Sequence, residues 1–319
     1  MKWVKQGKVF DPVDHKLPNN CVEFAQSPQT LVFDKFVRVY FSTRALDTDG
    51  RSYLSHISYA DFQPDFRKIL SVSDHVVMSL GGRGCFDEHG IFPMNILRNG
   101  NLIFGYTSGV NRRQSVPVDT AIGLAISRDQ GRTFQRISDG PILAASLHEP
   151  CLVADPFVMI RDGVFHMWYI FGAAWKQYAQ DAPPDRIYKI SHATSTDGIT
   201  WKTENGSQII NNCLGADECQ ALPTVIEINS IFHMFFCYRQ PNNFRQDSAR
   251  GYRIGHAISQ DLVTWTRRDD DFLLDVSDSG WDSEMLCYPH VFQLNGDIFM
   301  LYNGNNFGRR GFGLARLEE

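Results

Sequence analysis

Hydrophobic and polar residues along the chain follow a pattern of short strand-length runs separated by turn residues. Five apolar, aromatic-rich runs stand out: "FVRVYFSTR", "LIFGYTSG", "VFHMWYIFG", "IFHMFFCYR" and "IFMLYNGN". A shorter apolar run and a tight turn precede each of them, and several of the turns carry Asn-Gly or Asp-Gly, which is typical of β-hairpins. The pattern therefore predicts an all-β fold assembled from hairpins.

The hairpins recur as five copies of one repeat, 63 to 67 residues apart. A proline that follows a polar or acidic cluster opens each copy: Pro28, Pro93, Pro156, Pro223 and Pro289. A third strand follows each hairpin, and in the three middle copies it runs into "SRDQGRTF", "STDGITW" and "SQDLVTW". We expect the Ser and Asp side chains to satisfy turn amides while the aromatic residue packs inward and opens a fourth strand. Repeats of this length indicate a propeller or a related array.

The fifth copy has no fourth strand of its own, since the sequence reaches Glu319 after strand three. Trp3 in "WVKQGKVFDP" matches Phe134, Trp201 and Trp265, which open strand four elsewhere. We therefore predict a single-domain, five-bladed β-propeller with four antiparallel strands per blade, closed by the N-terminal strand. The blades are expected at about 21–80, 81–145, 146–212, 213–276, and 277–319 together with 1–12. A six-bladed ring is the alternative, but no sixth copy remains.

Composition narrows the class of protein. A net charge of -5 and scattered basic residues disfavour a nucleic-acid partner. No apolar stretch is long enough to span a membrane, and "MKWVKQGKVFDP" lacks the apolar core of a secretory signal. The 7 cysteines form no C-x-x-C pair, so we expect buried, reduced thiols in a cytoplasmic protein. We expect no cofactor.

Acidic residues recur before the repeat prolines. The residues five positions before each proline are Glu23, Glu88, Cys151, Glu218 and Glu284. Strand side chains alternate with period two, so the residue directly before the proline shares their face, and in the third copy it is Asp155. The prediction is a ring of five carboxylates around the central channel. The alternative is that each Glu caps its own blade through backbone amides or pairs with an arginine.

Arginines form a second set at the end of strand two, on the face where the longest connections are expected: Arg44, Arg112, Arg239 and Arg309. They either neutralise the acids or hold an anionic group of the substrate, such as a phosphate or a sugar carboxylate. Trp175 and Tyr238 are candidates for stacking on a sugar, and His290, beside a repeat proline, is a further binding candidate. Histidines spread over different blades are weak indicators of a metal site, so we expect none.

The five repeats, with their "S-x-D-L-x-x-W" turns, resemble the five-bladed propeller glycoside hydrolases of families 43 and 32. The resemblance is clearest in "VADPFVMIRDGVFHMWY" and "CYPHVFQLNGDIFMLYN" and covers the whole chain at the level of fold. The chain looks still more similar to uncharacterised propeller proteins encoded among bacterial surface-polysaccharide genes. Family 43 places Asp before the proline in its first two blades and Glu two positions before it in the third. Here Ser27, Phe92 and Ala154 occupy those positions, and only Asp155 stands in a matching "DP" motif.

The resemblance implies a carbohydrate-active enzyme that cleaves or transfers a glycosyl unit by carboxylate acid/base chemistry. "DECQALP" is similar to the "E-C" acid motif of family 32, so we expect Glu218 as general acid, Glu88 as base and Asp155 as the orienting carboxylate. The expected ligand is a sugar or oligosaccharide, bound by Glu23, Glu284 and the arginine, aromatic and histidine candidates. Two alternatives stay open. One is a phosphate- or nucleotide-sugar-dependent transferase or phosphorylase of polysaccharide biosynthesis, and the other is a non-catalytic glycan-binding propeller.

Overall fold

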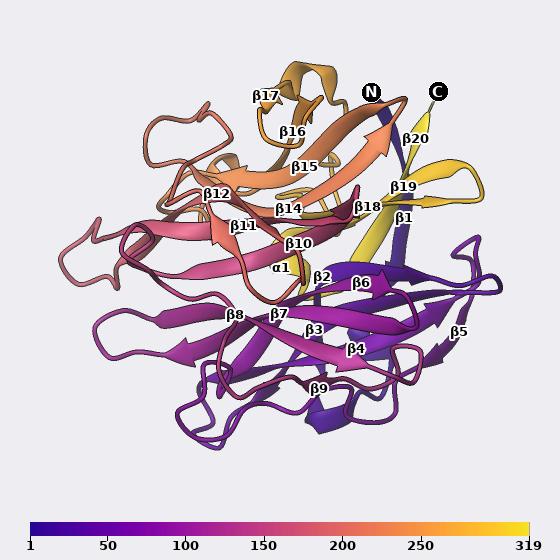
Figure 1. Cartoon of the computed structure of the whole chain (residues 1–319), viewed down its shortest axis with the longest axis horizontal. Helices are drawn as coiled ribbons and strands as arrows, with labels where there is room; N and C mark the ends of the chain where they lie inside the picture. The colour runs from indigo at the N-terminus through magenta and orange to yellow at the C-terminus, as the bar shows by residue number, and fades with distance from the viewer. Residues whose placement is uncertain (319) are drawn as a thin grey trace.

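The computed structural model describes residues 1–318, and nearly all of its regular structure is β-strand (Figure 1). The described residues form 20 strands in five groups of four, in which consecutive strands pair antiparallel. Short helical segments lie in the connections: η1 (Pro12–Asp14), η2 (Pro18–Asn20), η3 (Ser248–Arg250), η4 (Asp269–Asp271) and α1 (Asn305–Gly308). Over the described residues, no helix combines the length and apolarity needed to cross a bilayer.

The five strand groups follow the order of the sequence repeats. Group 1 contains β2 (Glu23–Val32), β3 (Val37–Leu46), β4 (Tyr53–Phe62) and β5 (Ile69–Val72). Group 2 contains β6 (Gly90–Asn99), β7 (Leu102–Arg112), β8 (Val118–Ser127) and β9 (Gln135–Arg136). Group 3 contains β10 (Val153–Arg161), β11 (Val164–Lys176), β12 (Asp185–Ser195) and β13 (Lys202–Thr203). Group 4 contains β14 (Cys219–Ile228), β15 (Ile231–Arg239), β16 (Arg253–Ser259) and β17 (Thr266–Arg267). Group 5 contains β18 (Cys287–Leu294), β19 (Asp297–Asn303), β20 (Phe312–Glu318) and β1 (Lys2–Phe10). A single parallel pair, Ser55 with Gly90, connects groups 1 and 2.

The N-terminal strand β1 is the outer strand of group 5. It runs antiparallel to β20, with Trp3 opposite Leu317 and Phe10 opposite Phe312. Both aromatic side chains are buried, and the Trp3 ring meets the ring of Phe235 in β15 edge-on at 5.5 Å. The two ends of the chain therefore lie side by side (Figure 1), and β1 also packs against group 4.

The aromatic-rich second strands are buried on both faces. Met167, Trp168 and Tyr169 follow one another in β11 and are fully buried, because the sheet has a neighbouring group on each side. A half-exposed strand would alternate between apolar and polar residues. The continuous apolar runs of the sequence are therefore explained by sheets stacked face to face.

The Ser-x-Asp turns form as the sequence predicts. The Ser127, Ser195 and Ser259 hydroxyls donate to the carboxylates two residues on, at 2.7, 2.8 and 3.0 Å. In the second of these turns Asp197 also accepts from the backbone N–H groups of residues 199 and 200, and these bonds lower its pKa to about 2. Phe134 and Trp265, which follow two of the turns, are buried. These turns therefore connect the third strand of each of these groups to its outer strand through fixed hydrogen bonds.

The five first strands contact one another in succession. β2 contacts β6 and β18, β6 contacts β10, β10 contacts β14, and β14 contacts β18. Asn95 of β6 donates to Gln29 of β2 at 3.0 Å and accepts from the Val158 amide of β10 at 2.9 Å. On the other side of β2, the Thr30 amide donates to Nε2 of His290 in β18 at 3.0 Å. The first strands therefore surround a common centre.

Candidate active site

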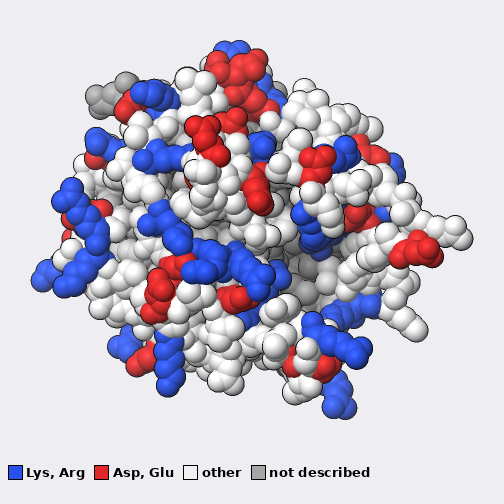
Figure 2. Space-filling model, turned by 180° about the vertical axis from the view of Figure 1, so that it is seen from behind, with Lys and Arg blue, Asp and Glu red and all other residues white. Residues whose placement is uncertain are grey.

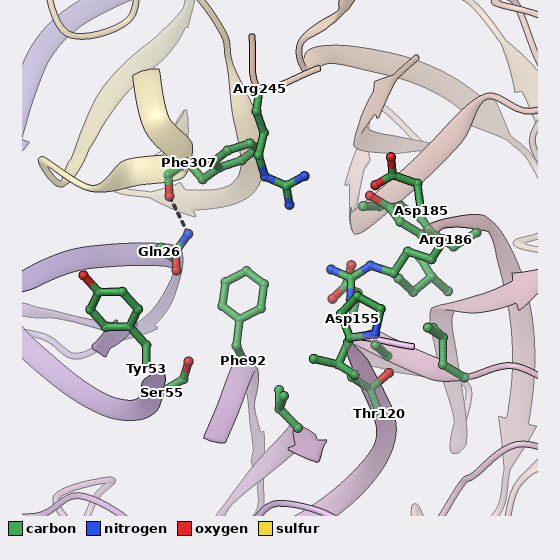
Figure 3. Close-up of a pocket in the computed structure, with 18 of the residues that line it drawn as sticks. Gln26, Tyr53, Ser55, Phe92, Thr120, Asp155, Asp185, Arg186, Arg245 and Phe307 are labelled. Atoms are coloured by element: carbon green, nitrogen blue, oxygen red, sulfur yellow. Dashed lines mark hydrogen bonds between the residues drawn. The ribbon is translucent and has the colours of Figure 1, made fainter. Parts of the chain in front are cut away.

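A cavity of about 670 Å³ opens at this centre, and all five strand groups line it. Each first strand contributes a lining residue close to its repeat proline: Gln26, Phe92, Asp155, Ala221 and Tyr288. The volume lies within the range of small-molecule sites, about 300–1,000 Å³. Figure 3 shows Phe92 near the middle of the cavity, with Asp155 on one side and the Gln26–Phe307 hydrogen bond on another.

These five lining residues stand one or two positions before the repeat prolines, where the strand pairing is irregular. The register shifts between Ile91 and Met94, Ala154 and Phe157, Ala221 and Thr224, and Cys287 and His290. Asp155 and Tyr288 there adopt left-handed backbone angles, with φ of 55° and 58°. Such β-bulges redirect side chains and interrupt the alternation of the strand. The residue five positions before the proline therefore does not share a face with the residue directly before it.

The predicted ring of carboxylates is consequently not formed around the cavity. Glu218 is fully buried outside it and pairs with Arg267 of β17 at 2.7 Å. Its carboxylate also accepts from the backbone amides of residues 213 and 214, at 2.7 and 2.8 Å. Burial alone would raise the pKa of Glu218, but the hydrogen bond from Gln220 and the charge of Arg267 lower it. A carboxylate with these partners is a structural anchor and not a proton donor, which corrects the role expected for Glu218.

The other three glutamates also lie outside the cavity lining. Glu88, the expected base, accepts from the Gly84 amide at 2.8 Å. Glu23 forms a two-pronged pair with Arg309, at 2.9 and 3.0 Å. Glu284 is exposed on the surface. The alternative reading of the sequence, in which a Glu caps its own loop or pairs with an arginine, therefore describes Glu23, Glu88 and Glu218.

Acids that precede the first strands bind cations on the outer strands of the same groups. Glu218 pairs with Arg267 in this way, the buried Asp87 accepts from Nε of Arg136 in β9 at 2.8 Å, and the buried Asp282 pairs with Lys5 of β1 at 2.7 Å. These contacts hold the outer strands to their groups. Two of the three strands, β9 and β17, are only two residues long, whereas β1 has nine residues. The acidic clusters of the repeats thus serve the architecture.

Asp155 is the acid that reaches the cavity from the first strands. Its side chain is 6% exposed, and its amide donates to the Ser108 hydroxyl at 2.8 Å. The carboxylate accepts from the Leu222 amide at 3.3 Å, and no cation of residues 1–318 lies within 4.0 Å of it. Burial raises the pKa of Asp155 to about 7, against the opposing charge of Arg186. Such a carboxyl can hold a proton and release it near neutral pH.

Six arginines line the same cavity, against two acids, Asp155 and Asp185. Two of the six are neutralised: Arg112 pairs with Asp47 at 2.6 Å, and Arg309 pairs with Glu23. Within residues 1–318, no carboxylate lies within 4.0 Å of the other four, which are Arg44, Arg186, Arg239 and Arg245. Figure 3 shows the Arg186 and Arg245 guanidinium groups extending into the cavity from different sides. Lys and Arg side chains also lie on several sides of a hollow in one broad face (Figure 2).

Arg239 and Arg245 bring two like charges to one aromatic ring. Their guanidinium carbons lie 3.5 and 4.2 Å from the centroid of Phe244. These two distances, 3.5 and 4.2 Å, put the guanidinium carbons at most 7.7 Å apart. At an effective dielectric constant of about 20, two unit charges at that distance repel by about 2 kcal/mol, and more if they are closer. Burial, and then the charges of Arg239 and Arg186, lower the pKa of Arg245. The cavity therefore carries positive charge that the described protein leaves uncompensated.

The sequence candidates divide into two classes. Arg44, Arg112, Arg239 and Trp175 line the cavity as expected. Tyr238 does not, because Arg267 lies over its ring at 4.5 Å. His290 does not either, because it is buried between β18 and β2, where burial lowers its pKa to about 3.

Sequence reasoning selected none of Arg186, Arg245 and Tyr288 as site residues, although all three line the cavity. Their positions in the chain carry a weak signal, which does not rank Arg186 above other arginines. Arg186 and Arg245 lie in or at the end of two of the longest connections, and Tyr288 directly precedes a repeat proline.

Comparison with known proteins identifies full-length relatives. No family model matches the chain. It is 33% identical, over 319 residues and 100% of both chains, to "Uncharacterized protein Rv1502" of Mycobacterium tuberculosis H37Rv. It is equally similar to "Uncharacterized protein MT1551" of strain CDC 1551. These values show common descent along the whole length.

Solved structures show the same fold. A protein described as "Glycoside hydrolase" superposes with a TM-score of 0.73 at 18% identity, covering 99% of this chain and 93% of that one. A thermostable family-43 glycoside hydrolase gives a TM-score of 0.65 at 14% identity, over 95% and 93%. β-1,2-Mannobiose phosphorylase from Listeria innocua, in complex with β-1,2-mannobiose, gives 0.64 at 13% identity, over 99% and 96%. The chain therefore has the propeller fold of glycoside hydrolases.

Proposed function

The chain belongs to the same protein family as Rv1502 and MT1551 of Mycobacterium tuberculosis, and we propose that it is a carbohydrate-active enzyme that breaks or transfers a glycosidic bond in the central cavity. The structures that share its fold include glycoside hydrolases and a mannobiose phosphorylase. Their activities do not define the reaction of this chain. The side chains of the cavity support the proposal.

Asp155 is the observation that carries the proposal. Breaking a glycosidic bond requires a proton on the leaving oxygen, and a carboxylic acid usually supplies it. Burial brings the pKa of Asp155 to about 7, so that a large fraction of the enzyme holds this proton at neutral pH. Asp155 and Trp175 line the same cavity, and the Trp175 ring offers a flat surface for a sugar. We therefore assign Asp155 the role of general acid, in place of Glu218.

We further propose that the five strand groups are the blades of a five-bladed propeller, with β1 as the closing strand. The succession of contacts among the five first strands supports this arrangement, as does the pairing of β1 with β20. In such a ring the residues before the repeat prolines face the axis from every blade. The substrate would then enter along the axis and meet Asp155 on the third blade.

The leaving group tests the role of Asp155. The 2,4-dinitrophenolate released from a dinitrophenyl glycoside is a stable anion and leaves without being protonated. An alcohol or sugar leaving group needs a proton from the acid. We expect Asp155→Asn to lower kcat/KM at least 100-fold for oligosaccharide substrates, the usual scale of general acid catalysis, and much less for the dinitrophenyl glycoside. In the wild-type enzyme, activity on oligosaccharides should fall above pH 7, as the acid loses its proton.

Asp65→Asn is the matched control, because Asp65 lies in an exposed turn between β4 and β5. It should leave both substrates unaffected. Equal losses on the two substrates in Asp155→Asn would contradict the role of acid. If a broad panel of glycosides shows no turnover, with or without added phosphate, the proposed enzymatic function is wrong.

A further inference from the structure

We infer that Arg44, Arg186 and Arg245 form a binding site for a phosphoryl group, supplied either by inorganic phosphate or by a sugar phosphate. The inference rests on the proposed function, because the site lies in the same cavity as Asp155. It specifies the anionic partner of the glycosyl group. The argument uses the charge of the cavity, the way the arginines are held, and the space between them.

The three arginines are held by aromatic rings and not by acids. The guanidinium carbons of Arg44, Arg186 and Arg245 lie 4.5, 5.7 and 4.2 Å from the ring centroids of Phe24, Tyr188 and Phe244. Stacking fixes the plane of a guanidinium group while its N–H groups point outward within that plane. These donors remain available to an anion. A carboxylate partner would have occupied them.

Arg44 carries a donor that the surrounding side chains do not satisfy. Its Nε is buried and has no hydrogen-bond partner among the described residues. Buried donors are nearly always satisfied, and each exception calls for an explanation. An oxygen of a bound anion in the cavity would satisfy it.

Arg239 has a different role in this cluster. Its Nε donates to the Tyr188 hydroxyl at 3.1 Å, and its Nη1 donates to the carbonyl oxygens of residues 240 and 241, at 2.8 and 3.0 Å. It thereby fixes the ring of Tyr188 and the start of the connection that carries Arg245. We treat Arg239 as a positioning residue.

The charge of the site favours a dianion over a monoanion. Three uncompensated guanidinium groups face a cavity whose central acid, Asp155, is readily protonated. A sugar carboxylate would bring one negative charge, whereas a phosphate group brings nearly two at neutral pH together with several acceptor oxygens. Arginine also matches phosphate in geometry through paired N–H donors. The three arginines come from β3, β12 and the connection after β15, and all of them line the cavity. Figure 3 shows that Arg186 and Arg245 approach it from different sides.

The chemistry balances for each source of the phosphoryl group. With inorganic phosphate, a phosphate oxygen forms a bond to the anomeric carbon while the glycosidic C–O bond breaks. Asp155 transfers its proton to the leaving oxygen, and the products are a sugar 1-phosphate and the shortened saccharide. With a phosphorylated saccharide as substrate, the arginines hold its phosphoryl group, and a water oxygen forms the bond to the anomeric carbon while the glycosidic C–O bond breaks. Asp155 transfers its proton to the leaving oxygen, and the proton lost by water passes to the solvent, from which Asp155 is protonated again.

Isothermal titration calorimetry at fixed ionic strength tests the site on the whole protein. The titrants are inorganic phosphate, a set of sugar 1-phosphates, and glucuronate and acetate as carboxylates. We expect the wild type to bind a phosphate compound at least tenfold more tightly than either carboxylate. Arg44→Gln and Arg245→Gln should each weaken that binding at least tenfold, with Arg245→Lys weakened less. The preferred titrant identifies the source of the phosphoryl group.

Two control variants test whether a loss of phosphate binding is specific to the proposed site. Arg113→Gln removes a positive charge that is paired with Asp119 outside the cavity lining, and it should bind phosphate as the wild type does. Asp155→Asn should bind phosphate at least as tightly as the wild type does. Phosphate binding in this variant therefore tests the phosphoryl site separately from the role of Asp155 as general acid. Circular dichroism and thermal melting confirm that each variant is folded. Absence of phosphate binding, equal binding of carboxylates, or unchanged binding in folded Arg44→Gln and Arg245→Gln would overturn the inference.

Discussion

Replacing Glu218 by Gln should lower the free energy of unfolding and leave the cavity unchanged, because Glu218 does not line it. The carboxylate and the Arg267 guanidinium are 0% and 9% exposed, respectively, and lie 2.7 Å apart. Glutamine keeps the size of the side chain but removes one of the two carboxylate partners of Arg267; the other, Asp269, stays at 2.7 Å. Breaking one side of a buried ion pair costs about 3–5 kcal/mol, and the remaining partner places the expected loss at the lower end, about 3 kcal/mol. With an unfolding entropy of about 2.1 cal/mol/K per residue, a loss of about 3 kcal/mol lowers the Tm of a chain of this length by roughly 4.5 °C.

Thermal melting and urea unfolding, followed by circular dichroism, measure this loss. The control is Asp271→Asn, which removes the partner of Arg268 from a pair that is 52% exposed on both sides, and it should change stability by less than about 1 kcal/mol. The double variant Glu218→Gln/Arg267→Gln should recover part of the loss, since no unpaired charge remains buried. A Glu218→Gln protein that melts within about 1 °C of the wild type but has lost its turnover would refute the structural role and restore the catalytic one.

Three further predictions concern the pH response, the N-terminal strand and the aromatic lining. The pKa of Asp155 is about 7 in the folded chain against 3.8 for the unperturbed group, so its ionisation destabilises the fold progressively from about pH 4 and fully above about pH 7. At about 1.36 kcal/mol per pKa unit, Asp155→Asn should raise the free energy of unfolding by about 3 kcal/mol more at pH 8 than at pH 5, as urea titrations would show; equal gains would contradict the shift. Trp3→Ala should lower the free energy of unfolding by about 3–5 kcal/mol, because it removes a large buried side chain. Urea titration measures this loss, with Lys2→Ala at an exposed position as the control. A smaller loss would mean that the fold does not depend on β1. Trp175→Ala should raise the KM for a glycoside while Tyr238→Phe leaves it unchanged, because only Trp175 lines the cavity; steady-state kinetics that show the same effect for both would contradict this placement.

The repeats made the strands and turns of this fold predictable from the sequence. Local signals sufficed: apolar runs, tight turns and the Ser-x-Asp motifs each determine structure within a few residues. Trp3 could also be assigned to an outer strand, because it matches the aromatic residues at the same place in other repeats.

The site was less predictable, because it depends on the β-bulges before the repeat prolines. Where a strand bulges, the alternation of side chains no longer tells which residues face the cavity. The expectation for Glu88 and Glu218 assumed an unbroken period of two up to the proline, and the register shifts between Ile91 and Met94 and between Ala221 and Thr224 break that period. Arg186 could not be ranked above other arginines of the sequence, because its lack of an acidic partner is a property of three-dimensional packing. Asp155 was selected correctly as a cavity residue, but its pKa follows from burial, which the sequence does not report.

The pairing of β1 with β20 has a consequence for how the protein is made. Residues 2–10 leave the ribosome well before residues 312–318, which form their partner strand. At about 5–20 residues per second, β1 waits for roughly 15 to 60 s before its partner exists. During synthesis, Trp3 and Phe10 have no completed group 5 in which to be buried, and an unpaired apolar strand can join the wrong sheet edge. The nascent chain should therefore depend on chaperones until its last strand emerges.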